Sequence, residues 1–174
     1  MIRIGIDPGK NGYVCMYRHY TNDFDENIIG FEYYPIPLIK GEVNLHELAD
    51  IFNIDASYVG GMHCVIEDVH ALFGASAKST FNFGWIVGAL EAILVSNGIP
   101  YNKVSPKDWQ KEMWQGIPKI TKQGKNSTDT KAMSLLAAKR LFPNEDLRAT
   151  ERSVKPCHDK IDALLLAEYC RRKF

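Results

Sequence analysis

Several features that mark other protein classes are missing from this sequence of 174 residues. It contains no C-x-x-C pair and no paired histidine spacing, and its four cysteines lie far apart, at Cys15, Cys64, Cys157 and Cys170. This usage favours a reduced, intracellular protein without a structural zinc site. No internal repeat, linker or low-complexity segment divides the chain, so we predict a single domain over residues 1–174.

Long apolar segments are also missing. No uninterrupted apolar run approaches the roughly 18 residues that indicate a membrane span. The residues that follow Met1 have the pattern of a strand and not that of a signal peptide. We therefore expect neither secretion nor membrane insertion, and we expect a cytoplasmic location.

Net charge is missing as well, because 21 Lys and Arg residues balance 21 Asp and Glu residues. Their distribution is uneven. Residues 21–68 hold ten acids against Lys40 alone, whereas residues 103–140 hold nine bases against three acids. Phosphate binding depends on the local field, so the basic region favours a nucleic-acid partner over a merely solvated surface. Six of its lysines stand among Trp109 and Trp114, at Lys103, Lys107, Lys111, Lys119, Lys122 and Lys125.

The first dozen residues are the most informative stretch that is present. Ile2, Ile4 and Ile6 alternate with other residues at the period of a strand. A Pro-Gly pair then ends the strand, and an Asn-Gly pair predicts a hairpin turn. Asp7 therefore stands at the last strand position. On this stretch alone, a turn-forming aspartate and a functional carboxylate are equally open interpretations.

The remaining pattern predicts an α/β fold with a mixed five-stranded sheet, built from a three-stranded antiparallel meander and parallel strands, with helices on its faces. Strands are expected at 2–6, 13–18, 27–36, 62–67 and 99–104, and helices at 44–52, 80–97, 107–114, 128 or 130 to 142, and 158–172. The helix at 80–97 is apolar on nearly every face, so we expect it to be deeply packed and also to contact a partner chain. Gly84 and Gly88 within it are interpreted as packing positions, and residues 116–127 as a flexible basic loop.

Four carboxylates occupy related places in this order of elements. Asp7 and Glu67 end strands, and Asp159 and Asp162 share one face at the start of the last helix. The helix dipole accounts for Asp159 alone, but Asp162 lies in an apolar run where an unpaired buried carboxylate is costly. Hard oxygen ligands suit Mg²⁺, with Mn²⁺ as the alternative. Two such ions about 4 Å apart can activate water and stabilise the leaving oxygen in phosphodiester hydrolysis.

Four segments together resemble, in order, the motifs of the RuvC-type Holliday junction resolvases. They are Ile-Gly-Ile-Asp-Pro-Gly at 4–9, Val-Ile-Glu at 65–67, Phe-Gly-Trp-Ile-Val-Gly at 83–88 and His-Asp-Lys-Ile-Asp-Ala-Leu at 158–164. The resemblance implies an RNase H-like fold, a homodimer formed through the helix at 80–97, and Mg²⁺-dependent symmetrical nicking of four-way DNA junctions. It places Asp7, Glu67, Asp159 and Asp162 on the four catalytic acids of the family. Our hypothesis for the mechanism is that Asp7 would bridge two ions. Compact members of this family are often found in phages, which implies the cytoplasm of a bacterium or of a phage-infected host.

Other correspondences are less direct. Phe73 is the nearest match to the aromatic residue with which the family probes the junction centre, and Lys78 in the same loop is a further DNA-binding candidate. Some relatives use a histidine near the metal site, which makes His158 a candidate there, although a histidine at a helix start is more often structural. The basic loop implies affinity for other branched DNA. The sequence points to no helicase partner.

Two alternatives remain open at this point. A non-catalytic protein that binds branched DNA can have the same fold, although such a protein has no need of four matching acids. The second alternative is an actin- or hexokinase-like ATPase. The phosphate-binding loop of that class also follows a strand with Gly-Ile-Asp and glycines, but the class needs a second, related domain.

Overall fold

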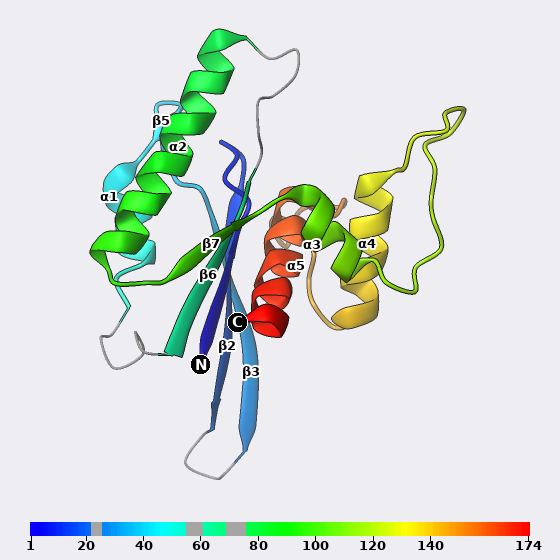
Figure 1. Ribbon diagram of the computed structural model, residues 1–174, viewed down its shortest axis with the longest axis horizontal. Coiled ribbons are helices and arrows are strands. Elements are labelled where there is room, and N and C mark those ends of the chain that lie inside the picture. The colour runs from blue at the N-terminus through cyan, green and yellow to red at the C-terminus, as the bar shows by residue number, and fades with distance from the viewer. Residues whose placement is uncertain (22–25, 55–60, 69–75) are drawn as a thin grey trace.

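A five-stranded mixed sheet forms the centre of the molecule in the computed structural model, which describes residues 1–21, 26–54, 61–68 and 76–174 (Figure 1). The sheet order is β3-β2-β1-β6-β7. The central strand, β1, pairs antiparallel with β2 and parallel with β6. The predicted mixed sheet is thereby confirmed. Its strands are β1 (Ile2–Ile6), β2 (Tyr13–Thr21), β3 (Asn27–Pro35), β6 (Met62–Glu67) and β7 (Tyr101–Val104).

A small hairpin outside this sheet was not anticipated from the sequence. Strands β4 (Leu38–Ile39) and β5 (Glu42–Val43) pair antiparallel across a two-residue turn. Both turn residues, Lys40 and Gly41, have positive φ, at 51° and 81°. Positive φ at both central positions is what a two-residue hairpin turn of type I′ requires. Two residues per strand are too few to produce a recognisable alternation, which is why the pattern was missed.

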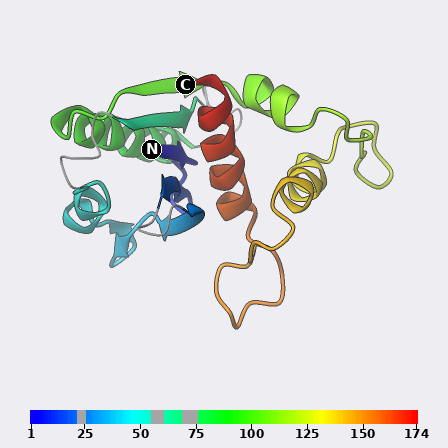
Figure 2. The same cartoon turned by 90° about the horizontal axis from the view of Figure 1, so that it is seen from below.

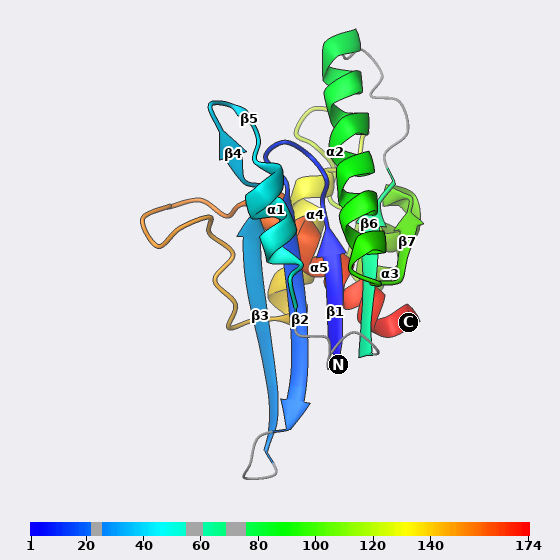
Figure 3. The same ribbon diagram turned by 90° about the vertical axis from the view of Figure 1, so that its left-hand side faces the viewer.

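Helices cover both faces of the sheet. Helices α1 (Leu45–Ile51) and α2 (Ala77–Ser96) lie on one face and stand in front of the strands in Figure 3. The other face is covered by α3 (Pro106–Met113), α4 (Thr130–Leu141) and α5 (His158–Lys173). Seen from below, α5 lies between the strands and α4 (Figure 2). Two separate hydrophobic cores result, one on each side of the sheet.

Gly5 explains how closely α5 lies on the sheet. A Cβ at this position would collide with the backbone nitrogen of Ala167 and the backbone oxygen of Ala163. Only a residue without a side chain therefore lets the middle of α5 rest directly on the central strand β1. This contact brings the start of α5 near the end of β1, where Asp7 follows.

Helix α2 is less buried than its composition predicted. Of its 20 residues, Ile86, Leu90 and Leu94 are buried, whereas Phe81 is 70% and Val95 65% exposed. Among the described residues, a Cβ on Gly84 or Gly88 would meet no atom within 4 Å. The prediction of deep packing is therefore wrong within one chain. The expectations that α2 contacts a partner chain and that its glycines are packing positions stay predictions.

The apolar character of α2 has a second consequence. Its hydropathy averages 1.3 over 18 residues, of which 17% are buried, so by length and composition alone the helix could cross a membrane. The sequence pattern hid this segment because polar residues interrupt the apolar ones. The expectation that the chain does not enter a membrane stays a prediction.

The basic loop between α3 and α4 is more ordered than predicted. Thr121 and Thr128 form an isolated β-bridge, and the amide of Lys122 donates to the carbonyl of Ser127 over 2.9 Å. At its base, the amide of Ile120 lies 3.3 Å from the Met133 sulfur on α4. The loop is therefore closed across its own backbone and attached to α4.

Candidate active site

Asp7 lies at the mouth of a tight turn between β1 and β2. Its amide donates to the carbonyl of Tyr13 over 3.0 Å, and the amide of Gly12 donates to that of Gly9 over 2.8 Å. A Cβ on Gly12 would collide with the backbone oxygen of Asp7, so the turn closes this tightly only with glycine there. One carboxyl oxygen of Asp7 accepts the amide of Gly9 over 3.3 Å. Asp7 thus does help to form the turn.

Glu67 lies beside Asp7 because of strand register. Strands β1 and β6 run parallel, with Ile6 opposite Ile66, so the residues that follow emerge at the same edge of the sheet. One carboxyl oxygen of Glu67, Oε1, accepts the indole N–H of Trp109 over 2.9 Å. Burial raises the pKa of Glu67, and this hydrogen bond lowers it in part.

Asp159 and Asp162 stand in the first turn and a half of α5. The Oδ1 atom of Asp162 is buried and has no hydrogen-bond partner within the described part of the chain. A hydrogen bond with the hydroxyl of Ser134 on α4 and the positive charge of Lys131 both lower the pKa of Asp162. Burial outweighs them and raises this pKa to about 7, with further contributions from the charges of Glu67 and Asp159.

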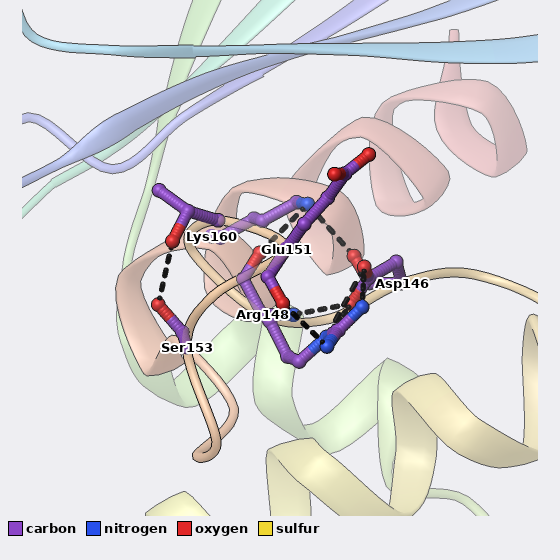
Figure 4. A network of polar contacts seen from close by, with 6 residues as sticks. Asp146, Arg148, Glu151, Ser153 and Lys160 are labelled. Atoms are coloured by element: carbon purple, nitrogen blue, oxygen red, sulfur yellow. Dashed lines mark hydrogen bonds and ion pairs between the residues drawn. The ribbon is translucent and has the colours of Figure 1, made fainter.

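The segment before α5 is folded back onto that helix (Figure 4). Lys160 donates from Nζ to the carbonyl oxygens of Asp146 and Arg148, over 2.7 and 3.0 Å. The Arg148 guanidinium in turn forms an ion pair with Asp146 over 2.7 Å. The Lys160 ammonium also lies 4.2 Å from the ring centre of Tyr33 on β3. These contacts hold the start of α5, and with it Asp159, against the sheet.

The other three acids act on Asp7. The pKa of Asp7 is raised to about 8, first by burial and then by the charges of Glu67, Asp162 and Asp159. Each of the other three carboxyl groups therefore acts on Asp7, although they come from two distant parts of the chain, the end of β6 and the start of α5. The structure brings all four acids singled out from the sequence to one edge of the sheet.

Comparison with known proteins gives a fold but no sequence relative. No protein-family model matches this sequence, and no curated protein matches it either. Solved structures do. The RuvC of T. thermophilus in complex with a Holliday junction substrate aligns with a TM-score of 0.54 at 14% identity, covering 99% of this chain and 97% of that one. The chain has the RuvC fold.

Two further structures agree. A second Thermus thermophilus RuvC structure aligns with a TM-score of 0.51 at 16% identity and covers 96% of this chain and 91% of that one. The yeast mitochondrial Holliday junction resolvase aligns with a TM-score of 0.53 at 14% identity, and the alignment covers 98% of this chain and 83% of that one. Identities this low show the fold alone, and they confirm the predicted RNase H-like architecture.

A divalent cation fits the acids that the RuvC fold gathers here. The set consists of hard oxygen donors, two of them have pKa values raised by burial and mutual repulsion, and one buried oxygen of Asp162 has no described partner. A bound cation reverses that repulsion. Among the described residues, however, no three His, Cys, Asp or Glu side chains form a ready ligand cluster. The charges of the other three carboxyl groups act on Asp7, but the four groups do not surround one point as the ligands of a bound ion do.

A cleft of about 820 Å³ opens beside Asp7 in this RuvC fold. Its walls are the turn after β1, the β4–β5 hairpin and the first half of α2. Polar and aromatic side chains share the lining, among them Lys10, Lys78, Asn82, Phe81 and Trp85. Lys78 was a DNA-binding candidate from the sequence, whereas Lys10 was missed, although it directly follows the Pro-Gly turn.

The other sequence-predicted residues have different outcomes. Phe73 lies outside the described residues. The six lysines of the basic region are all exposed, and Lys103 forms an ion pair with Glu91 over 3.0 Å. Trp109, which stands among those lysines in the sequence, is wholly buried and presents no ring at the surface. The Nδ1 atom of His158 is buried without a partner in the described structure, which leaves its role at the site a prediction.

Three side chains that support the acids were not singled out from the sequence: Trp109, Ser134 and Lys131. Trp109 donates to Glu67, whereas Ser134 and Lys131 lower the pKa of Asp162. Each lies far from its acid in the chain, and none belongs to a local motif. The one available signal was the place of Trp109, a large aromatic residue one turn into a helix that directly follows a sheet strand.

Proposed function

We propose that this chain is an endonuclease that cuts four-way DNA junctions, and other branched DNA, with the help of Mg²⁺. One observation carries this proposal: four carboxyl groups from β1, β6 and α5 converge at one sheet edge and raise the pKa of Asp7 to about 8. Acids this costly to bring together suit the binding of divalent cations. The solved neighbours with this fold are Holliday junction resolvases, which supports the choice of substrate.

The residues of the chain have distinct parts in the proposed reaction. Asp7, Glu67, Asp159 and Asp162 would hold the cations, and Mn²⁺ would serve in place of Mg²⁺. Two bound ions would supply an activated water and neutralise the charge on the leaving oxygen. Lys10 and Lys78 lie in the cleft next to Asp7, where they would bind the phosphates that flank the scissile one. Contacts of this kind position the strand without reading its bases.

The function is tested with purified protein and a panel of labelled DNA substrates in Mg²⁺ and in EDTA. The panel holds a four-way junction, a three-way junction, a flap and a linear duplex. We expect paired, symmetrical nicks in the four-way junction in Mg²⁺ and none in EDTA. Junction binding without cleavage in Mg²⁺ or Mn²⁺ would instead identify a non-catalytic junction binder. Binding of ATP would favour the actin-like alternative.

We also propose that two copies of the chain pair through α2, which would place two active sites on opposing strands of one junction. The outward side of α2 carries a stripe of exposed small and apolar residues: Gly84, Gly88, Ala92 and Val95. Their spacing of about one helical turn puts them on one face. The two glycines have open space in front of them, so a second helix can approach closely there. Burying Val95 against a second copy would remove apolar surface from water.

Replacing Val95 with Glu is expected to abolish this pairing. Val95 is 65% exposed, so the substitution leaves the fold of one copy intact but places a charge in the apolar contact. Sedimentation should show the wild-type chain of 19.7 kDa as a dimer and the variant as a monomer, which nicks one strand at a time.

The control for this experiment is Leu136→Glu, which adds the same charge at an exposed apolar position on α4. It should remain dimeric. A monomeric wild-type chain would contradict the proposal, and wild-type protein that instead sediments with lipid vesicles would assign the α2 surface to a membrane.

The basic loop is expected to bind DNA through phosphates. Replacing Lys119, Lys122 and Lys125 together by Ala should weaken junction binding about equally for every sequence. Each lysine that contacts a phosphate contributes about 0.9 to the slope of log affinity against log salt. The slope should therefore fall by up to about 3, measured by fluorescence anisotropy over a range of salt concentrations.

A charge-matched control for the loop variant is available elsewhere on the surface. Lys139, Arg152 and Lys155 are exposed and lie outside the loop. Replacing these three by Ala should change the slope less. Equal slopes for the two triple variants would show that the loop does not contact the DNA.

A further inference from the structure

Trp109 makes an unusual contact for a core residue. Its side chain is wholly buried, and its indole N–H donates to Oε1 of Glu67 over 2.9 Å. The indole belongs to the core that also contains Val65, Met113 and Leu164. A buried indole N–H that loses its acceptor destabilises the fold. Packing therefore holds the ring, and the ring holds one oxygen of the carboxyl group.

The backbone explains why this tryptophan reaches Glu67. In the sheet, Glu67 pairs with Val104 at the end of β7, and α3 begins two residues later. Ser105 caps α3 by accepting the amide of Asp108 over 3.3 Å, and Pro106 occupies the first turn. These features allow no slack between the strand and the helix. Trp109 is thus carried back over the sheet edge where Glu67 emerges.

The far end of α3 is held as well. Glu112 forms an ion pair with Lys173 at the end of α5 over 2.9 Å. Helix α5 is the element that carries Asp159 and Asp162. The Trp109 ring is thereby positioned relative to both the strand that ends in Glu67 and the helix that supplies the other two acids.

An indole suits this place chemically. It is a hydrogen-bond donor only, it carries no charge, and it does not titrate near neutral pH. It can hold one oxygen of Glu67 without binding a cation itself and without adding a charge to the site. The second carboxyl oxygen does not take part in this hydrogen bond. A lysine or a histidine at this position would compete with a cation for the same carboxylate.

We propose that Trp109 is a positioning residue for Glu67, and that its indole reports the binding of a divalent cation by the four acids. The second part, that the indole reports cation binding, rests on the proposed function. Hydrogen bonds to ligating carboxylates support metal affinity, and their removal commonly costs roughly 10-fold to 100-fold. The fluorescence of an indole depends on its surroundings, and Trp109 directly contacts one of the groups that a cation would bind.

Trp114 provides a matched comparison in the same core. Its ring packs edge-to-face against that of Trp109, with ring centres 6.5 Å apart. Its Nε1 atom is buried but has no partner among the residues that the structure describes. The two indoles share an environment, and one of them alone contacts a carboxylate of the candidate site. Replacing each by Phe removes the N–H and keeps an aromatic ring.

The first measurement is a fluorescence titration that needs no nuclease activity. The variant Trp85→Phe/Trp114→Phe retains Trp109 as its single tryptophan. Addition of Mg²⁺ or Mn²⁺ should change its fluorescence saturably, with the same dissociation constant as calorimetry gives. Adding Glu67→Gln should remove the response, because the amide oxygen still accepts the indole N–H but carries no charge. Cation binding seen by calorimetry with no fluorescence change would overturn the reporter role alone, and no binding by either method would overturn the proposed metal site as well.

The second measurement compares Trp109→Phe with Trp114→Phe in an otherwise wild-type chain. Trp109→Phe should raise the dissociation constant for Mg²⁺ by about 10-fold or more, by calorimetry, and should raise the Mg²⁺ concentration needed for half-maximal cleavage by a similar factor. Trp114→Phe should leave both values near those of the wild type. Equal dissociation constants for wild type and Trp109→Phe would overturn the positioning role. Should Trp109→Phe fail to fold, the single-tryptophan titration still decides the inference.

Discussion

Replacing Asp7 with Asn is expected to abolish Mg²⁺-dependent cleavage of a four-way junction while leaving junction binding intact. Asn preserves the size of the side chain, and its carbonyl oxygen can still accept the amide of Gly9, so the turn after β1 should be retained. The substitution removes the charge of Asp7, on which the other three carboxyl groups act. Loss of several kcal/mol of transition-state stabilisation corresponds to a fall in rate of roughly 1,000-fold or more.

The measurement is the rate of junction nicking under single-turnover conditions, together with the dissociation constant for the same junction in Ca²⁺ or EDTA. Glu151→Gln is a suitable control, because it removes one exposed carboxylate that lies outside the four. Cleavage at the wild-type rate by Asp7→Asn would remove Asp7 from the active site. Loss of binding together with cleavage would mean that Asp7 supports the DNA surface and not the chemistry.

The stability of the metal-free protein is expected to fall as the pH rises from about 4 to about 8. The pKa of Asp7 rises from 3.8 to about 8 on folding, and that of Asp162 from 3.8 to about 7. Between these values the folded chain binds more protons than the unfolded chain. The free energy of unfolding therefore decreases with pH over this window. Below the lower value and above the higher one, these two groups add no slope.

Mg²⁺ should oppose this loss, because a cation competes with protons for the same carboxyl groups. We expect thermal unfolding in EDTA to show a melting temperature that decreases from pH 5 to pH 8, and the increase caused by Mg²⁺ to be larger at the higher pH. The double variant Asp7→Asn/Asp162→Asn should have a flatter profile and a smaller response to Mg²⁺. A wild-type melting temperature that rises across this window would show that the acids are not buried together.

Local sequence patterns were sufficient for the elements that carry the acids. The strand before Asp7, the strand that ends in Glu67 and the helix that begins at His158 all lie where the pattern put them. Strand alternation, a Pro-Gly break and an i, i+3 pair of acids depend on residues close together in the chain. Parallel pairing of two such strands then brings their ends to one edge.

Contacts between distant segments were beyond the reach of those patterns. The composition of α2 predicted deep burial, yet burial depends on what lies around a helix, and much of α2 faces outward. The sequence placed Trp109 among lysines, and the pattern of α3 does not reveal that this side chain is buried. The β4–β5 hairpin, which forms one wall of the cleft, was too short to be seen at all.

The sequence by itself thus determined which residues end strands and begin helices, and so determined that Asp7, Glu67, Asp159 and Asp162 occupy related places. Those are consequences of local backbone preferences. Only the tertiary structure decided how strongly the other three acids act on Asp7 and which side chains hold them. Burial and hydrogen bonding across more than forty residues of chain, as between Trp109 and Glu67, depend on packing that no local pattern contains. For Asp7, this packing raises the pKa of the carboxyl group. The turn that follows β1 is thereby part of a candidate cation site.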